Sequence, residues 1–244
     1  MAELALNNSL ISEYLNFKFQ NNYNANKTRK LLKYIQTFSI RNDHPLVTDP
    51  SMQMQLNNDP LIDIIQSCSD DDLVKNSSLK LMLVDSYVNT SYTVVNIQNS
   101  YEKIKLRFGG TYTGSLDKNN AQKHIKALLS DASYIIIYDS YINADNNQWA
   151  ENKSIIQSIV PQVDINLKIE SGSVRNHKPA LTNDEKLELN SICSLWNIQS
   201  NQYNDNSFHD RYIESDKVKI LLSGGIYNIS TNSNKDFTYV VEIK

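Results

Sequence analysis

The second half of the chain alternates between helical and strand-like hydrophobic spacing, and this alternation limits its fold more than any other feature. The segment "DKNNAQKHIKALLSD" has apolar residues at helical spacing behind Asp117, a residue type that caps helices. The next segment, "SYIIIYDSYI", is apolar enough for a strand buried on both faces of a sheet. Helical and strand-like segments then alternate through "NKSIIQSIV", "DINLKIES", "LTNDEKLELNSICSLW" and "SFHDRYIES", before two further strands, "KVKILL" and "FTYVVEIK". The pattern predicts an α/β domain over residues 117–244, with a mixed sheet layered with helices.

Residues 1–110 carry a different pattern and resemble no family. An amphipathic helix is predicted in "TRKLLKYIQTF", followed by a proline-containing loop and a short helix in "PLIDIIQSC". Three strand-like segments, "LKLMLVDSYV", "YTVVNIQ" and "EKIKLRFGG", are separated by Asn- and Ser-rich turns. We therefore expect N-terminal helices followed by a three-stranded β-meander.

Composition limits the classes of function. The 244 residues carry a net charge of −3 and an isoelectric point near 5.8, which is not the signature of a general nucleic-acid binder. No apolar run approaches the roughly 20 residues that span a bilayer, and the N-terminus does not resemble a secretory signal, so a cytoplasmic protein is expected. Two cysteines and four histidines form no cluster with metal-ligand spacing, so neither a metal nor another cofactor is expected.

A group of polar residues near the C-terminus has the composition of a phosphate site. In the strand-like "SFHDRYIES", His209 and Arg211 are two residues apart, so their side chains are expected on one face. An aspartate, two glycines and an asparagine follow, and these are Asp216, Gly224, Gly225 and Asn228.

This spacing resembles the signature of the phospholipase D superfamily. That signature is His-x-Lys, four residues, Asp, about six residues, Gly-Gly or Gly-Ser, and a later Asn. Here Arg211 stands in place of Lys and the glycine pair comes one residue late. The "HDR" sequence is similar to a subgroup that includes small bacterial proteins and the C-terminal domain of MIT-domain proteins. The strand ending in "YDSYI" also resembles the first core strand of such domains, and the resemblance covers residues 117–244.

The resemblance implies a role for His209 and for a carboxylate. In the superfamily one histidine attacks phosphorus and a second protonates the leaving oxygen, which makes His209 the implied nucleophile or acid. The segment "NSNKDFTYVVEI" resembles the later Asn-x-Glu element, with Asn234 and Asp236 in those places, so Asp236 would orient the imidazole. Because the chain has one plausible motif, two histidines would require a homodimer with the site at its interface.

The other motif residues would bind the phosphate. Arg211 would hold the nonbridging oxygens, while Asn228 and the backbone amides near Gly224 and Gly225 would donate hydrogen bonds. Asp216 is expected to fix the turn or Arg211. The bulkier guanidinium could displace the phosphate from in-line attack, so binding without cleavage stays open as an alternative.

Three functions follow from these patterns. The first is a metal-independent phosphodiesterase acting on nucleic acid, and the subgroup's frequent association with genome defence, including phage defence, is an implication of the resemblance. The second is a noncatalytic module that recognises phosphate on nucleic acid, a lipid headgroup or a nucleotide. The third is a protein whose N-terminal region binds a protein partner. A charged hairpin without a ligand is the remaining interpretation of "HDRYIESDKVK".

An earlier match to the signature is a decoy. In "HIKALLSD", His124, Lys126 and Asp131 have the right spacing, but they lie in a segment with helical periodicity. Residues two apart on a helix diverge by about 200° and cannot share a face. We therefore predict that His124 is a histidine on the surface of a helix.

Overall fold

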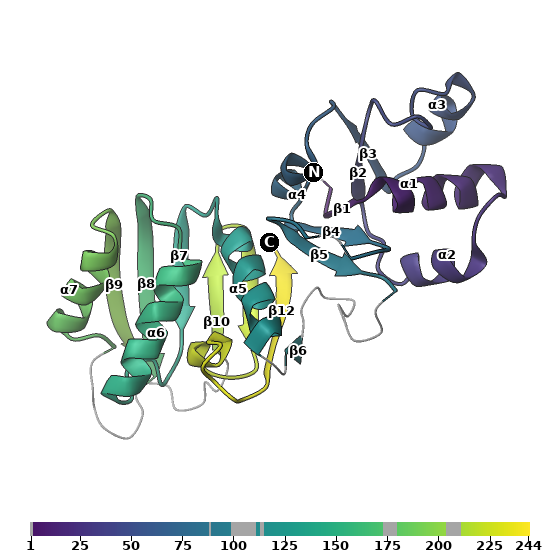
Figure 1. Ribbon diagram of the computed structural model, residues 1–244. Helices are drawn as coiled ribbons and strands as arrows, with labels where there is room; N and C mark the ends of the chain where they lie inside the picture. Colours follow the sequence, from purple (N-terminus) through teal and green to yellow (C-terminus); the bar gives the residue numbers. More distant parts are fainter. Residues whose placement is uncertain (1, 88, 99–110, 113–114, 173–179, 204–210) are drawn as a thin grey trace. The chain divides into compact units, whose positions relative to one another are not determined.

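The computed structural model describes residues 2–87, 89–98, 111–112, 115–172, 180–203 and 211–244 (Figure 1). The chain divides into two compact units, Met1–Leu106 and Arg107–Lys244. The sequence placed the change of pattern between residues 110 and 117. Each unit has its own sheet.

The first unit is built on a five-stranded parallel sheet in the order β3-β2-β1-β4-β5. Its strands are β1 (Leu4–Leu6), β2 (Phe38–Arg41), β3 (Ile62–Ile65), β4 (Leu81–Val84) and β5 (Thr93–Asn96). Its helices are α1 (Asn8–Leu15), the π-helical η1 (Asn16–Gln20), α2 (Ala25–Leu31), α3 (Pro50–Asn57) and α4 (Asp70–Asn76).

Both faces of this sheet are covered, and successive side chains of β1 point to opposite faces. Ala5 packs in a buried cluster with Met82 of β4 and with Leu73 of α4. On the other face, Tyr14 of α1 makes an edge-on ring contact with Phe38 of β2, with ring centroids 5.1 Å apart. Strands covered on both faces are typical of parallel sheets, whose crossover connections carry helices.

The predicted β-meander is wrong. Strands β4 and β5 pair in parallel, with Leu81 opposite Thr93, whereas a meander requires antiparallel neighbours. The third predicted strand falls on residues that lie outside the described part. The segment "PLIDIIQSC" contains strand β3 rather than a helix, and the predicted helix around "TRKLLKYIQTF" ends early, because Phe38 already belongs to β2.

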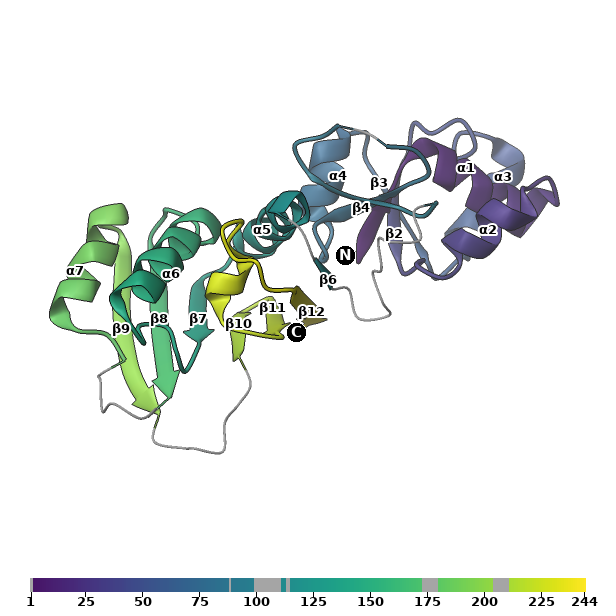
Figure 2. The ribbon, with the colours of Figure 1, turned by 60° about the horizontal axis from the view of Figure 1, so that its bottom comes forward.

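The second unit is a seven-stranded mixed sheet in the order β6-β12-β11-β10-β7-β8-β9. Its strands are β6 (Thr111–Tyr112), β7 (Tyr134–Tyr138), β8 (Ile165–Gly172), β9 (Trp196–Tyr203), β10 (Arg211–Ser215), β11 (Val218–Leu222) and β12 (Phe237–Ile243). Its helices are α5 (Ser115–Leu129), α6 (Asn146–Ile159), α7 (Asn183–Ile192) and the short 3-10 helix η2 (Ile226–Ile229). Helices α5, α6 and α7 lie along one face of the sheet (Figure 2).

The sequence predicted this unit as an α/β fold with a mixed sheet, and the structure confirms that class. Two details differ. Helix α5 begins at Ser115, so Asp117 lies inside it rather than capping it, and strand β9 was not predicted. Helix α7 begins with a capping box, in which Thr182 accepts from the backbone of Glu185 at 3.2 Å and the Glu185 side chain accepts from the backbone of Thr182.

His124 and Lys126 of the decoy motif lie on helix α5, as the helical periodicity predicted, and Asp131 follows the end of this helix. His124, however, does not lie on the surface. It is 2% exposed, and its Nδ1 is 2.6 Å from the hydroxyl of Tyr239 on β12. The prediction of a surface histidine is therefore wrong, because this face of α5 packs against the sheet. Within the described residues, none of the helices combines the length and apolar character of a membrane span.

Candidate functional site

Sheet topology brings three distant segments to one edge of the second unit. Strand β10 lies between β7 and β11 and is antiparallel to both. Tyr212 pairs with Tyr138 and Arg211 pairs with Leu222, so the start of β10 lies beside the ends of its two neighbours. The residues that follow β7 and β11 therefore meet the first residue of β10.

Asp139 connects these segments. It follows β7 directly, and its side chain is fully buried. Its Oδ1 accepts a hydrogen bond from the backbone N–H of Tyr141 at 2.9 Å, and its Oδ2 accepts one from Ile226 at 2.8 Å. Burial raises the pKa of the Asp139 carboxyl, against the lowering effect of the two backbone donors and of Arg211. One carboxylate thus joins the end of β7, the start of η2 and the start of β10.

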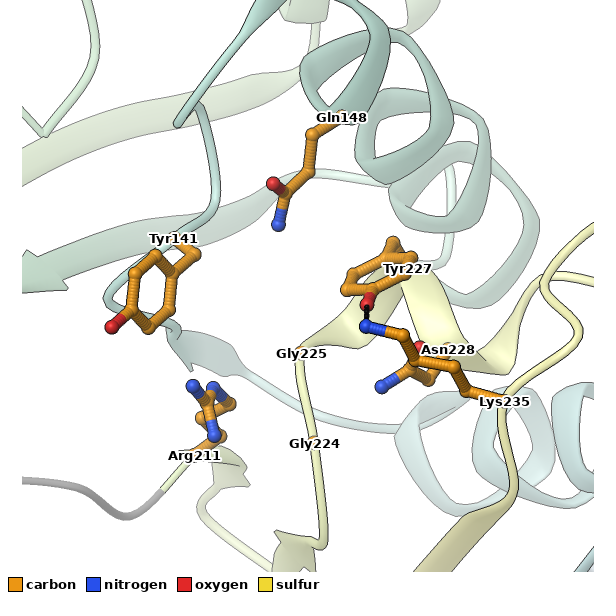
Figure 3. A pocket seen from close by; sticks show the side chains of 8 residues that line it. All are labelled: Tyr141, Gln148, Arg211, Gly224, Gly225, Tyr227, Asn228 and Lys235. Carbon is orange, nitrogen blue, oxygen red and sulfur yellow. Dashed lines mark hydrogen bonds between the residues drawn. The ribbon is translucent and has the colours of Figure 1, made fainter.

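Arg211 is held at this edge by two contacts. Its buried Nε lies 3.5 Å from Asp139 Oδ1, which is an ion-pair contact at a long distance for a hydrogen bond. The guanidinium carbon lies 5.2 Å from the ring centroid of Tyr141, which is a cation–π distance. The side chain is 24% exposed. Figure 3 shows its terminal nitrogens directed into a pocket of about 370 Å³ that Arg211 lines.

The glycine pair forms the floor of this pocket and lies against Asn228. A Cβ added to Gly224 would lie 2.4 Å from Asn228 Nδ2, so only glycine allows this approach. A Cβ on Gly225 would lie 3.1 Å from Asp139 Oδ2. Asn228 is buried, and its Oδ1 accepts from Ser233 Oγ at 3.1 Å. This bond turns the Nδ2 donors of Asn228 toward Gly224 and the pocket.

The opposite wall carries a second cation that the sequence did not single out. Lys235 Nζ donates to the hydroxyl of Tyr227 at 2.6 Å and lies 5.4 Å from the centroid of its ring. Both residues line the pocket, and Gln148 enters it from the first turn of α6 (Figure 3). The local signal for Lys235 was weak, because the motif comparison placed Asn234 and Asp236 on either side of it.

A buried lysine fixes the turn that carries Lys235. Lys118 of α5 is 1% exposed, and its Nζ donates to the backbone carbonyls of Ser233 and Lys235 at 2.6 and 2.7 Å. Burial lowers the pKa of Lys118, and the negative charge of Asp236 opposes this effect. Asp236 itself is exposed and does not line the pocket. The structure therefore does not bring this predicted site residue to Arg211.

The remaining predicted residues lie elsewhere or outside the described part. Asp216 lies in the turn between β10 and β11, where it accepts from the backbone N–H of Ser133 at 2.9 Å and contacts Lys217 at 3.4 Å. It thus fixes a turn at the other end of β10 and does not contact Arg211. His209 lies outside the described residues, so its role stays a prediction.

The pocket is suited to an anion. It presents two cations, the amide of Asn228 and the backbone of Gly224 and Gly225, whose N–H groups have no hydrogen-bond partner within the described residues. None of the described lining residues is acidic. Cations with neutral donors in one concave site are the groups that bind phosphate.

Comparison with known proteins adds no family. No known protein family matches the chain, and no curated protein does. A solved structure that is similar in part is TrmBL2, described as an archaeal chromatin protein with a novel mode of DNA binding. It is 11% identical, with a TM-score of 0.27, and the match covers 57% of this chain and 47% of that one. The match spans about half the length of TrmBL2, and at this TM-score it carries no argument about fold or function.

Proposed function

We propose that this protein is a phosphodiesterase of the phospholipase D type that acts on nucleic acid. One observation carries the proposal: Arg211, Asn228 and the pair Gly224–Gly225, which the sequence grouped as a phosphate-binding motif, line one pocket. The contacts of Gly224 with Asn228 and of Gly225 with Asp139 support a single binding site, because a larger side chain at either position would press against these polar groups. A charged hairpin without a ligand would not require these contacts.

In the proposed reaction, His209 attacks the phosphorus of a diester while the bond from phosphorus to the leaving oxygen breaks. The leaving oxygen takes a proton from His209 of the partner subunit, so an alcohol departs and a phosphohistidine remains. Water then attacks this phosphorus, the histidine is released, and the proton returns to the second imidazole. The net reaction converts a diester and water into a monoester and an alcohol. Arg211 and Lys235 would offset the charge on the nonbridging oxygens.

A noncatalytic phosphate-recognition module is the second candidate, and one observation favours it. The described side chains that line the pocket can donate hydrogen bonds or charge to a phosphate, and none of them is a carboxylate or an imidazole. Asp236, the carboxylate predicted to orient His209, is exposed and outside the pocket lining. Such a module would bind a phosphate ester and release it intact.

The test measures binding and cleavage separately. Phosphate binding is titrated by calorimetry for the wild type and for Arg211→Ala, with Arg29→Ala as the matched control on an exposed position. We expect Arg211→Ala to weaken binding about ten- to a hundredfold, since hydrogen bonds to a charged group contribute about 1.5–3 kcal/mol. Unchanged binding would overturn both candidates.

Cleavage of bis(p-nitrophenyl) phosphate, single-stranded DNA and RNA in EDTA then separates the two. Hydrolysis that His209→Ala abolishes, together with a dimer by analytical ultracentrifugation, supports the phosphodiesterase. Intact ligand with Arg211-dependent binding supports the recognition module. A monomer that still cleaves would contradict the shared site.

A further inference from the structure

The pocket has room for more than a phosphate group. Its volume of about 370 Å³ lies within the range of about 300–1,000 Å³ that is usual for small-molecule sites. Arg211, Asn228 and Lys235 account for the anion. The rest of the described lining is polar or aromatic, and it includes neither an aliphatic side chain nor a carboxylate. A group attached to the phosphate is therefore expected to be polar, and neither an acyl chain nor a cation.

Gln148 is the lining residue best placed to read that group. Its backbone N–H is already bound, at 2.9 Å from Asp145 Oδ1, and this contact fixes the first turn of α6. Its side-chain amide has no hydrogen-bond partner within the described residues, is half-buried and points into the pocket (Figure 3). A primary amide offers one acceptor oxygen and two donors, so it can make paired hydrogen bonds to a planar edge with an adjacent donor and acceptor.

A nucleobase is the common biological group with such an edge, and glutamine pairs with bases in this way. The rings of Tyr141 and Tyr227 line the same pocket and add aromatic surface of the kind on which bases stack. A sugar alone offers hydroxyls without the planar edge. A choline cation would need the tyrosine rings, and these already lie beside the like charges of Arg211 and Lys235.

From these contacts we infer that the pocket takes one nucleotide, with its phosphate on Arg211 and Lys235 and its base edge on Gln148. This inference rests on the proposed phosphate site and names its substrate class. Gln148 is then a specificity-determining residue. A free mononucleotide and an unpaired nucleotide of a strand both present a phosphate and an accessible base edge.

The experiment is a calorimetric panel on the full chain with inorganic phosphate, ribose 5-phosphate and the four ribonucleoside monophosphates. At least one nucleotide is expected to bind about tenfold or more tightly than ribose 5-phosphate, the factor that paired neutral hydrogen bonds provide. Gln148→Ala should abolish that gain and leave the affinity for inorganic phosphate unchanged. Gln157→Ala, on an exposed position of the same helix, is the matched control and should change neither.

Equal affinity for ribose 5-phosphate, all four nucleotides and a single-stranded oligonucleotide would overturn the inference and leave the phosphate site intact. Loss of affinity for inorganic phosphate in Gln148→Ala would also overturn it, because Gln148 would then act on the phosphate. A gain shown by the oligonucleotide alone, and abolished in Gln148→Ala, supports it with a strand as the source. Phosphate binding that does not depend on Arg211 is a different outcome, which removes the proposed function itself.

Discussion

Replacing Asp139 by asparagine tests the structural basis of the site. The two carboxylate oxygens of Asp139 accept from two different backbone N–H groups, those of Tyr141 and Ile226. Asparagine keeps the shape of the side chain but has one acceptor oxygen, and its second position is an NH2 donor. In the Asp139→Asn variant, one of the two N–H groups, the buried one of Ile226 or the partly buried one of Tyr141, therefore faces another donor.

The expected cost follows from this loss. A buried donor left without an acceptor costs about 1–3 kcal/mol. Loss of the negative charge beside Arg211 adds to this cost. This contribution is small, because the Arg211–Asp139 distance is long and Arg211 is partly exposed, and because the variant no longer buries a charge. We expect the free energy of unfolding to fall by about 2 kcal/mol, which corresponds to a shift of about 1 M in the urea midpoint.

Tryptophan fluorescence during urea unfolding measures this change in the correct unit. Both tryptophans of the chain, Trp149 and Trp196, lie in the second unit, so their emission reports its unfolding and not that of the first. The matched control is Asp216→Asn. Asp216 accepts the backbone N–H of Ser133, and asparagine can keep that bond, so a cost below about 1 kcal/mol is expected. Equal costs for the two variants would refute the role given to Asp139.

The pH dependence has a definite sign. Burial raises the pKa of folded Asp139 above its ordinary value of 3.8. The stability that a group with a raised pKa contributes is complete below the unfolded pKa and is lost as pH rises through the folded pKa. The advantage of the wild type over Asp139→Asn should therefore widen as pH is lowered from neutral toward about 4. An advantage that shrinks over this range would contradict the raised pKa.

Three further substitutions separate the site from the scaffold. Gly224→Ala would place a methyl group 2.4 Å from Asn228 Nδ2; displacement of that amide should weaken phosphate binding about tenfold in calorimetry, and unchanged affinity would count against Asn228 as a donor. Lys118→Met removes both hydrogen bonds to the turn that carries Lys235. The free energy of unfolding in urea should fall by about 2 kcal/mol, and phosphate binding should weaken. A wild-type free energy of unfolding together with wild-type phosphate affinity would exclude this anchoring. Thr182→Ala removes the cap of α7 and should cost about 1 kcal/mol, with phosphate binding unchanged; a change in binding would show that the scaffold variants are not independent of the site.

The second unit could be predicted from sequence because its elements are long enough to show their period. Helices α5 and α6 have 15 and 14 residues, and the alternation with strands fixes the class of fold locally. In the first unit, β1 has three residues and β2 and β3 have four each, which is too short to tell a buried strand from a helical turn. The direction in which β4 and β5 pair is a tertiary property, and local turn residues did not reveal it.

The site was predictable in the same uneven way. Arg211, the glycine pair and Asn228 were identified because they lie within one stretch of chain at the spacing of a known motif. Gln148 and Tyr227 carry no such spacing, and they reach the pocket because α6 and η2 follow strands that end at the same edge of the sheet. The structure shows that the sheet edge, and not the motif alone, defines the lining.

An arginine at position 211 has a physical explanation in this arrangement. A lysine ammonium carries its three donors on one nitrogen, so the group that binds Asp139 and the group that faces the pocket would be the same atom. A guanidinium can do both, because its Nε faces Asp139 while its terminal nitrogens face the cavity (Figure 3). A compact ammonium charge is supplied by Lys235, on the opposite wall and held by Tyr227. The pocket therefore presents a cation on each of two facing walls, and one of these cations also binds the carboxylate that joins the strand ends.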